Sequence, residues 1–341
     1  MKDTTGICLI GAGRAGMIHG RNFASRVPHA RMAAVSDVSE ECAKAAAREL
    51  GVDAVYTDYR EALKDSAVDA VIVVTPTKFH RDIVLEAAHA GKHILCEKPM
   101  AMNREECRDM IDAAERGGVK LQIGFMRRFD AGFRRAKEMI DSGAIGEVVS
   151  VKSLTRGPSV PQEWMYDIRK SNGPLAEVNS HDIDTLRWFT GSEAASLYAM
   201  AGNYRCVSAR EKYPDFYDTV LMNVRMKNGM MGNIDGAQGV RYGYDARVDI
   251  LGTEGCVQIG SLAGNTTLVF TKDRRMQADV VKSWTDLFYE AYVNEDISFV
   301  ETIRSGGEPL VRGIDGMRAV EIVRAGNESI ETGKIIELSG D

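Results

Sequence analysis

Three glycines near the start of the chain have the spacing of a dinucleotide-binding turn. They are Gly11, Gly13 and Gly16, directly after the apolar run at residues 7–10. In such a turn the first glycine allows a tight bend, the second lets the backbone approach a pyrophosphate, and the third lets the next helix pack on the sheet. The anion binds at the helix N-terminus. We therefore expect the whole turn to bind a cofactor, which adds Ala12, Arg14 and Ala15.

An aspartate follows at the distance at which such folds recognise the adenosine ribose. Asp37 stands 21 residues after Gly16, at the end of a second apolar run at residues 32–35. A carboxylate there accepts hydrogen bonds from both ribose hydroxyls, and its charge repels a 2′-phosphate. The sequence therefore predicts NAD rather than NADP. Glycines at this spacing also occur in ordinary loops, so the prediction depends on this strand, helix and aspartate context.

Two later apolar runs also end in residues that could take part in chemistry. Residues 70–74 lead into Thr75, Pro76 and His80, and residues 93–96 lead into Glu97, Lys98 and Pro99. The ends of parallel strands open onto the ligand crevice, so we expect Lys98 and Glu97 beside the cofactor; a surface lysine is the alternative. Thr75-Pro76 is either a plain turn or a cofactor contact. His80 either packs at a helix start or contacts the cofactor.

The last histidine of the chain stands among carboxylates. Glu177, His181 and Asp184 are spaced i, i+4 and i+7, which predicts one helix with all three on one face. Oxidation of an alcohol needs a base for the hydroxyl proton, and a histidine held by a carboxylate can serve near neutral pH. We expect His181 to be catalytic and Glu177 to orient it or the substrate, with a structural histidine as the alternative. Lys98 would hydrogen-bond the same oxygen, and the sequence leaves open which group takes the proton first.

Several other residues are candidates for a pocket that binds a polyol. They are Arg127, Trp164, Asn179, Asp184 and Tyr242. Pockets for small polar ligands combine aromatic walls with a few placed polar groups, which is the reason for choosing these residue types. For Arg127, Trp164, Asn179 and Tyr242 the alternative is an ordinary surface charge or a packed aromatic ring.

The elements that must position these residues form two predicted domains. Residues 1–124 alternate helical patterns with short runs that are apolar on both faces, at 7–10, 32–35, 55–56, 70–74, 93–96 and 119–123. Such runs predict a doubly wound parallel Rossmann sheet with helices on both sides. Helix signals agree, since Ser39 is a candidate N-cap and Asn103 with Glu106 resembles a capping box.

The pattern changes beyond residue 124. Alternating strands are predicted at 148–155, 196–203, 219–226, 230–235, 246–251 and 256–259. They indicate an α+β domain at residues 125–341 with a large, mainly antiparallel open sheet, used for substrate binding and oligomerisation. We expect its bare face to pair with another subunit in a homodimer or homotetramer. Helices predicted at 284–306 and 313–325 would pack back on the first domain.

Composition narrows the class of protein. The 341 residues carry a formal net charge of −6, which argues against nucleic acid or an anionic membrane as the main partner. The longest apolar runs are strand-length, and we expect a cytoplasmic protein without a signal peptide. Its six cysteines contain no CxxC pair, which indicates reduced, mostly buried thiols and no metal site.

Three motifs resemble the Gfo/Idh/MocA family, named for glucose-fructose oxidoreductase, inositol dehydrogenase and a rhizopine-catabolism protein. They are the turn from Gly11 to Gly16, Thr75-Pro76 with His80, and Cys96-Glu97-Lys98-Pro99-Met100-Ala101, the most specific of the three. The resemblance covers essentially the whole chain. It implies that Lys98 lies beside the nicotinamide and the reacting hydroxyl, and that the peptide before Pro99 is often cis.

The resemblance also bears on the second cluster. The family has a histidine as its acid–base group, matched by His181, with a carboxylate four residues earlier that is commonly aspartate in the inositol dehydrogenases. Glu177 departs from this by one methylene, which places polyols other than inositol among the candidate substrates. The tract from Arg241 to Gly255 is similar to the inositol dehydrogenase subgroup.

These observations together predict an NAD-dependent dehydrogenase that oxidises a secondary ring hydroxyl of a cyclic polyol or sugar to a ketone. Two alternatives are open. One is an oxidoreductase or glycoside-modifying enzyme that retains NAD through a redox cycle. The other is a non-catalytic protein that senses NAD.

Overall fold

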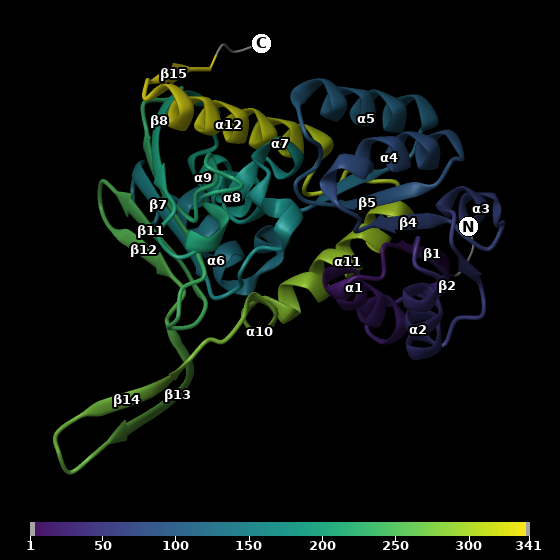
Figure 1. Ribbon diagram of the computed structural model, residues 1–341, viewed down its shortest axis with the longest axis horizontal. Helices are drawn as coiled ribbons and strands as arrows, with labels where there is room; N and C mark the ends of the chain where they lie inside the picture. Colours follow the sequence, from purple (N-terminus) through teal and green to yellow (C-terminus); the bar gives the residue numbers. More distant parts are fainter. Residues whose placement is uncertain (1–3, 339–341) are drawn as a thin grey trace. The chain divides into compact units, whose positions relative to one another are not determined.

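The computed structural model describes residues 4–338 and divides the chain into two compact units (Figure 1). Unit 1 comprises the residues up to Phe129 together with Glu290–Val320. Unit 2 comprises Asp130–Tyr289 together with the residues from Glu321 onward. The division differs from a single cut at residue 124, because a segment from the C-terminal part of the chain belongs to unit 1.

A six-stranded parallel sheet forms the centre of unit 1. Its order is β3-β2-β1-β4-β5-β6, the doubly wound arrangement, which confirms the predicted Rossmann sheet. The strands are β1 (Thr5–Ile10), β2 (Ala30–Ser36), β3 (Val55–Tyr56), β4 (Ala70–Val73), β5 (His93–Glu97) and β6 (Leu121–Gly124). β1 and β4 are buried along their whole length, as expected for strands covered on both faces.

Helices cover both faces of this sheet. Figure 1 shows α1 (Arg14–Ser25), α2 (Glu40–Leu50) and α11 (Tyr289–Ser305) on one side, and α4 (His80–His89) and α5 (Arg104–Gly117) on the other. Phe299 of α11 packs in one apolar core with Phe23 of α1, so the returning helix completes the core of unit 1. The predicted caps are confirmed: Ser39 Oγ accepts from the Cys42 N–H, and Asn103 Oδ1 from the Glu106 N–H.

A seven-stranded sheet forms the centre of unit 2, in the order β12-β11-β7-β10-β9-β8-β15. β7 and β10 are parallel and the other neighbours antiparallel, which confirms a mainly antiparallel sheet. The strands are β7 (Val148–Gly157), β8 (Ala194–Gly202), β9 (Thr219–Met226), β10 (Met231–Gln238), β11 (Asp245–Gly252), β12 (Cys256–Ile259) and β15 (Ile336–Glu337). Helix α9 (Ser180–Thr190) covers one face, where Leu186 lies against Gly232.

The sequence did not predict a two-stranded arm in unit 2. β13 (Ala263–Phe270) and β14 (Met276–Val280) pair with each other, and every residue of both strands is exposed. Figure 1 shows this hairpin extending away from the seven-stranded sheet.

The remaining described elements are α-helices and 3-10 turns outside the two sheets. The α-helices are α3 (Tyr59–Lys64), α6 (Ala131–Asp141), α7 (Ile168–Ser171), α8 (Gly173–Glu177), α10 (Trp284–Leu287) and α12 (Gly313–Thr332). The 3-10 turns are η1 (Thr77–Phe79), η2 (Met126–Phe129), η3 (Glu163–Tyr166) and η4 (Val207–Ala209). Within residues 4–338, none of the helices has the length and apolar character needed to span a membrane.

Candidate active site

The glycine turn of unit 1 has the backbone conformation that its sequence predicts. Gly11 has a φ of +99°, and a Cβ there would lie 2.4 Å from the Val74 oxygen. A Cβ at Gly16 would lie 2.0 Å from the Gly11 oxygen, so the helix approaches the turn too closely for any side chain. At Gly13, by contrast, a Cβ would meet nothing within 4 Å. Gly13 is also the N-cap of α1, so open space lies beside the helix N-terminus, where anions such as a pyrophosphate bind.

Asp37 lies at the end of β2 and is tied to this turn. Its Oδ2 accepts a hydrogen bond from the Ala12 N–H at 2.8 Å, and its Oδ1 accepts one from the Ser39 N–H at 2.9 Å. The carboxylate is half-buried, which leaves part of it accessible to ribose hydroxyls. Asp37 is therefore oriented by backbone donors before any ligand arrives.

His80 joins the two loops that follow β4 and β5. Its Nε2 lies 2.7 Å from the Thr75 oxygen and its Nδ1 lies 3.0 Å from the Pro99 oxygen, and the ring is buried. Burial lowers the pKa of His80, and the hydrogen bonds to the Thr75 and Pro99 oxygens oppose this effect only in part. This geometry favours the packing alternative for His80. Thr75 itself has a buried Oγ1 without a hydrogen-bond partner, which suits a polar contact with a cofactor.

Lys98 follows β5 at the same edge of the sheet as the glycine turn, because all strands in this sheet are parallel. It is half-buried, whereas Glu97 before it is buried. The Lys98 N–H donates to Glu97 Oε2 at 2.9 Å, and the Lys98–Pro99 peptide is cis, as the family resemblance implies. The groups at this edge fit a dinucleotide: the start of α1, the Asp37 carboxylate and the Thr75 hydroxyl.

The predicted single helix from Glu177 to Asp184 is wrong. Glu177 is the last residue of α8, and α9 begins only at Ser180. Asn179 lies between the two helices, and its Nδ2 donates to Asp182 Oδ2 in the first turn of α9 at 2.8 Å. Glu177 and His181 therefore belong to two different helices, while His181 and Asp184 share α9.

Asp182 fixes the helix start that carries His181, and the sequence analysis missed it. Its Oδ1 accepts hydrogen bonds from Ser153 Oγ at 2.5 Å and Thr155 Oγ1 at 2.9 Å, both on β7. Asp182 is fully buried. Since it directly follows a buried His181, these bonds to a central strand hold the histidine backbone in place. The alternation of serine and threonine along β7 is the only sequence signal for this anchor.

Asn179 lies against the parallel strand β10. A Cβ at Gly236 would lie 2.0 Å from Asn179 Oδ1, so only glycine leaves room for this amide. The same oxygen is buried and has no hydrogen-bond partner, and the same is true of Ser180 Oγ. Two buried acceptor groups beside His181 suit a ligand rich in hydroxyl groups.

The other predicted pocket residues are distributed over both units. Arg127 lies in η2 of unit 1 and is only 1% exposed, so it is not the surface charge that was the alternative. Asp184 lies 3.9 Å from Arg187, also buried. Trp164 donates to Gln162 Oε1 at 2.9 Å. Tyr242 lines a cavity of about 700 Å³ in unit 2 with Tyr166, Tyr204, Arg205 and Arg241, and this cavity does not include His181.

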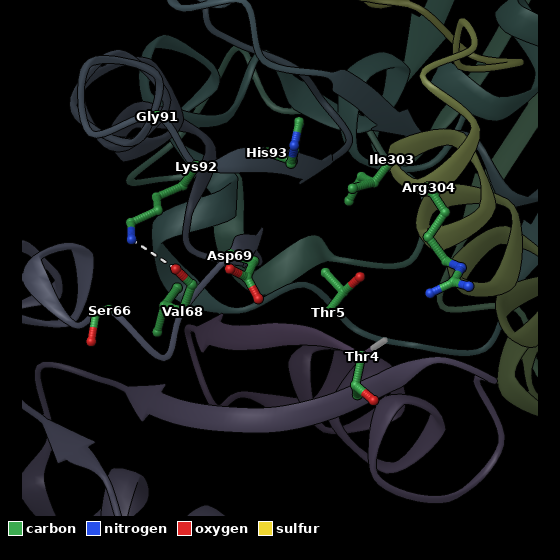
Figure 2. A pocket seen from close by; sticks show the side chains of 10 residues that line it. All are labelled: Thr4, Thr5, Ser66, Val68, Asp69, Gly91, Lys92, His93, Ile303 and Arg304. Carbon is green, nitrogen blue, oxygen red and sulfur yellow. Dashed lines mark hydrogen bonds between the residues drawn. The ribbon is translucent and has the colours of Figure 1, made fainter. Parts of the chain in front are cut away.

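A second cavity, of about 380 Å³, lies at the opposite edge of the sheet in unit 1 (Figure 2). Thr5 and His93 line it from the amino ends of β1 and β5. Lys92 donates from Nζ to the Val68 oxygen at 2.7 Å and the Asp65 oxygen at 3.2 Å, so its ammonium group is engaged by backbone carbonyl groups. This cavity is at the amino edge, whereas ligands of doubly wound sheets bind at the carboxyl edge.

Comparison with known proteins agrees with the fold and the glycine turn. Residues 5–125 match the model of the GFO/IDH/MocA oxidoreductase family, described as an NAD-binding Rossmann fold, and residues 133–258 match the C-terminal domain model of that family. The chain is 33% identical to scyllo-inositol 2-dehydrogenase (NAD(+)) of Bacillus subtilis, with 99% of this chain and 97% of that protein covered. It is 31% identical to myo-inositol 2-dehydrogenase of Thermotoga maritima, with 97% and 98% covered.

A solved structure gives the same result. Scyllo-inositol dehydrogenase of Lactobacillus casei, with bound cofactor NAD(H) and scyllo-inositol, superposes with a TM-score of 0.89 at 27% identity, over 98% of this chain and 99% of that one. Both family models together span most of the sequence, and the relatives match over nearly their full length. The chain therefore belongs to the GFO/IDH/MocA family of oxidoreductases, and its first domain is an NAD-binding Rossmann domain.

Proposed function

We propose that this protein oxidises a secondary ring hydroxyl of an inositol-like cyclic polyol to a ketone, with NAD as the cofactor. The observation that carries the proposal is the carboxyl edge of the unit 1 sheet. There an NAD-type glycine turn follows β1, Asp37 follows β2 and Lys98 follows β5, and all three strands belong to one parallel sheet. Full-length similarity to inositol 2-dehydrogenases supports the class of substrate.

The residues that would hold the cofactor are those of the turn and the strand ends. The first N–H groups of α1 would bind the pyrophosphate, Asp37 the adenosine ribose, and Thr75, Pro76 and Glu97 the nicotinamide half. When bound, NAD accepts the hydride from the substrate carbon. Asp37 is already oriented by the Ala12 N–H, which reduces the ordering needed when the ribose binds.

His181 is proposed as the group that takes the hydroxyl proton. A neutral imidazole is a suitable base near pH 7, and loss of the proton from the oxygen makes departure of the hydride easier. Asp182 contributes by anchoring the start of α9 to β7. Glu177, at the end of α8, is proposed to bind a substrate hydroxyl or orient the histidine, and Arg127, Trp164, Asn179, Asp184 and Tyr242 remain proposed substrate contacts.

Lys98 is proposed to donate a hydrogen bond from its ammonium group to the reacting oxygen. A cationic donor stabilises the negative charge that develops on this oxygen as its proton is lost. The side chain follows a turn whose backbone is held by Glu97, so its starting point is fixed.

The function is tested with a panel of inositols, aldoses, uronates and glycosides, each with NAD and with NADP. We expect absorbance of NADH at 340 nm to rise in proportion to ketone formed from a cyclic polyol. Turnover without released NADH would instead indicate an enzyme that retains its cofactor. NAD binding with no turnover of any cyclic compound would contradict the proposal.

A homodimer or homotetramer through the sheet of unit 2 is part of the proposal. The face of this sheet opposite α9 exposes Met200, Leu221, Met231 and Leu251, one from each of four strands. The arm formed by β13 and β14 also exposes Leu268, Val269 and Phe270. Exposed apolar patches of this kind mark interfaces, and an isolated two-stranded hairpin is only marginally stable in water. A second copy of the chain would cover both, and we propose the cytoplasm as its location.

A further inference from the structure

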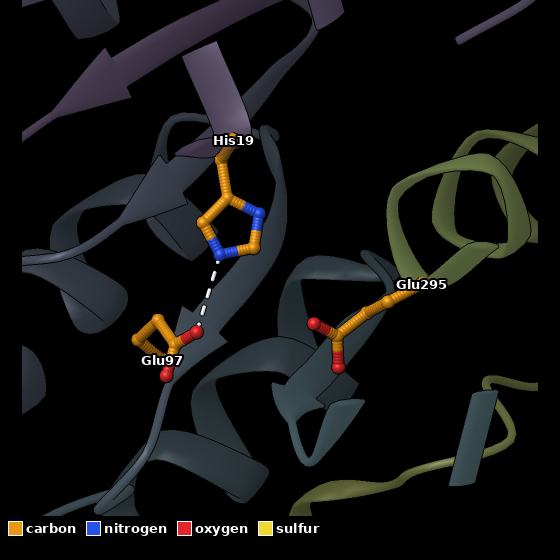
Figure 3. A group of neighbouring side chains, drawn as sticks. All are labelled: His19, Glu97 and Glu295. Carbon is orange, nitrogen blue, oxygen red and sulfur yellow. Dashed lines mark hydrogen bonds and ion pairs between the residues drawn. The ribbon is translucent and has the colours of Figure 1, made fainter. Parts of the chain in front are cut away.

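A buried cluster of ionisable side chains lies next to the Lys98 turn in unit 1, and of its four members only Glu97 has a proposed role so far. His19 comes from α1, Glu97 ends β5, and Glu295 and Asp296 come from α11. None of the four is more than 6% exposed. Figure 3 shows the side chains of His19, Glu97 and Glu295 turned toward one another. One nitrogen or oxygen atom of each lies within 4.8 Å of those of the other two.

Both ring nitrogens of His19 meet carboxylates. Nδ1 lies 2.7 Å from Asp296 Oδ1, and Nε2 lies 3.2 Å from Glu97 Oε1. Asn22, also on α1, donates to Asp296 Oδ2 at 2.8 Å. An imidazole that donates hydrogen bonds from both nitrogens carries both protons and offers no lone pair to a metal ion. The geometry therefore fits an imidazolium among carboxylates better than a metal site.

The charges of this cluster depend on one another. Burial alone would lower the pKa of His19, but the carboxylates of Asp296 and Glu97 outweigh it and raise the pKa well above 6.5. Burial would likewise raise the pKa of Glu97, but His19 lowers it through its hydrogen bond and charge. Without the His19 cation, the buried Glu97 carboxylate would take up a proton more readily.

Glu97 connects this cluster to Lys98. Its Oε1 meets His19, and its Oε2 accepts the hydrogen bond from the Lys98 N–H at 2.9 Å. On the next strand, Gly124 is the register partner of Glu97, and a Cβ there would lie 2.9 Å from the Glu97 Cδ. The carboxylate is thus held between an imidazole ring, a backbone N–H and a glycine.

We propose that His19, clamped between Asp296 and Glu97, is a positioning residue that fixes the Glu97 carboxylate against the backbone of Lys98 and so sets the position of that lysine. The inference rests on the proposed role of Lys98 in the reaction. The proposed role of His19 involves no contact with substrate or reacting atoms, because His19 acts through Glu97.

The first test does not depend on activity. The groups that face His19 are Glu97, Glu295 and Asp296, with the Tyr292 ring 5.4 Å away edge to face. In the full-length protein, we expect the NMR shift of the Lys98 amide to stay constant from about pH 5 to 8, because Glu97 remains ionised. In H19Q, Glu97 loses the group that lowers its pKa, so it protonates at a higher pH than in the unmodified protein, and the amide shift follows this titration. In H19Q/E97Q the titration disappears, which identifies Glu97 as the titrating group.

The second test uses turnover of the best cyclic polyol from the panel. We expect H19Q and D296N to lower kcat roughly 10- to 100-fold, since a small misplacement of a reacting group has effects of this size. The Kd for NAD should change by less than about threefold, and kcat in H19Q should gain a new decline on the acidic side. H89Q, which replaces an exposed histidine at the end of α4, is the control and should match the unmodified protein.

Two results would overturn the inference. One is a Lys98 amide shift with the same pH dependence in the unmodified protein and H19Q. The other is an H19Q variant that melts at a lower temperature but keeps the original kcat and pH profile, which would show a purely structural role. Absence of turnover by the unmodified protein would refute the proposed function alone, and the amide titration would still decide whether His19 controls Glu97.

Discussion

The Asp37 carboxylate accepts a hydrogen bond from the Ala12 N–H at 2.8 Å, and this bond joins the end of β2 to the glycine turn. The acidic residue proposed to select the ribose is therefore also tied to the turn that is proposed to bind the pyrophosphate. Removal of Asp37 should weaken the binding of both NAD and NADP, because it disturbs the turn. It should weaken NAD binding more, because only NAD presents a free 2′-hydroxyl.

We expect Asp37→Ser to shift the NAD:NADP ratio of kcat/KM by about 10- to 100-fold toward NADP. The serine keeps a short polar acceptor for the turn but removes the charge that repels a 2′-phosphate. Initial rates with both cofactors measure the shift. Asp53→Ser changes an exposed aspartate nearby and should leave the ratio unchanged. An unchanged ratio in the Asp37 variant would contradict its proposed role.

His181→Asn should lower kcat roughly 100-fold or more and leave NAD binding intact, because the variant loses the base but unit 1 is untouched. Calorimetry for NAD and absorbance at 340 nm for turnover measure the two effects. His89→Asn, at an exposed helix end, is the matched control. If His181→Asn kept more than about a third of the original kcat, another residue would have to accept the proton.

Gly236→Ala should displace the Asn179 amide, since the added Cβ would lie 2.0 Å from Asn179 Oδ1. We expect a loss of about 1–3 kcal/mol in the free energy of unfolding, the usual range for overpacking, and a reduced kcat. Urea denaturation and kinetics check both. Gly157→Ala on the neighbouring strand β7 is the control, because its Cβ would stand 3.5 Å from the Tyr244 ring, an ordinary contact. Equal effects in the two variants would argue against a special role for the Asn179 site.

Thiol reactivity should separate the cysteines by burial. Cys42 and Cys256 are exposed, whereas Cys8, Cys96, Cys107 and Cys206 are buried. Burial raises the pKa of Cys8 to about 12, so at pH 8 it remains a protonated, unreactive thiol. We expect Ellman's reagent to label two thiols per native chain and six in denaturant. Rapid labelling of Cys8 in the native protein, located by mass spectrometry, would show that β1 opens readily.

Charges on the bare face of the unit 2 sheet should weaken association. Leu221 and Leu251 are exposed on β9 and β11, and a buried unpaired carboxylate costs several kcal/mol in an interface. We expect L221E/L251E to lower the mass measured by light scattering at micromolar concentration. V38E, at an exposed site in unit 1, should keep the original mass. If L221E/L251E had the same mass as the unmodified protein, the interface would lie elsewhere.

The sequence predicted the parts whose pattern is local. All six strands of unit 1 were predicted, because strands buried on both faces are apolar throughout. The helix starts at Ser39 and Asn103 were also predicted, because each N-cap side chain accepts from an N–H only three residues further along the chain. The break between α8 and α9 was not found. The spacing of Glu177 and His181 cannot show that the Asn179 side chain binds Asp182 instead of continuing a helical face.

Contacts between side chains far apart in the sequence could not be predicted either. His19 meets partners 78 and 277 residues further along the chain, and no periodicity connects such positions. The β13–β14 arm was not predicted for a different reason. Since both of its faces are exposed, no alternation of apolar and polar residues marks it as a strand pair.

The division of the chain into units has a consequence for synthesis. The ribosome completes β1 to β6 early, but Phe299, which packs in their core, is made only after the whole Asp130–Tyr289 stretch has been translated. The apolar surface of the nascent nucleotide-binding sheet that α11 later covers therefore stays exposed while unit 2 is translated. Such an interval is when chaperones commonly bind, and a messenger cut short before the codon for Phe299 would yield a product prone to aggregate.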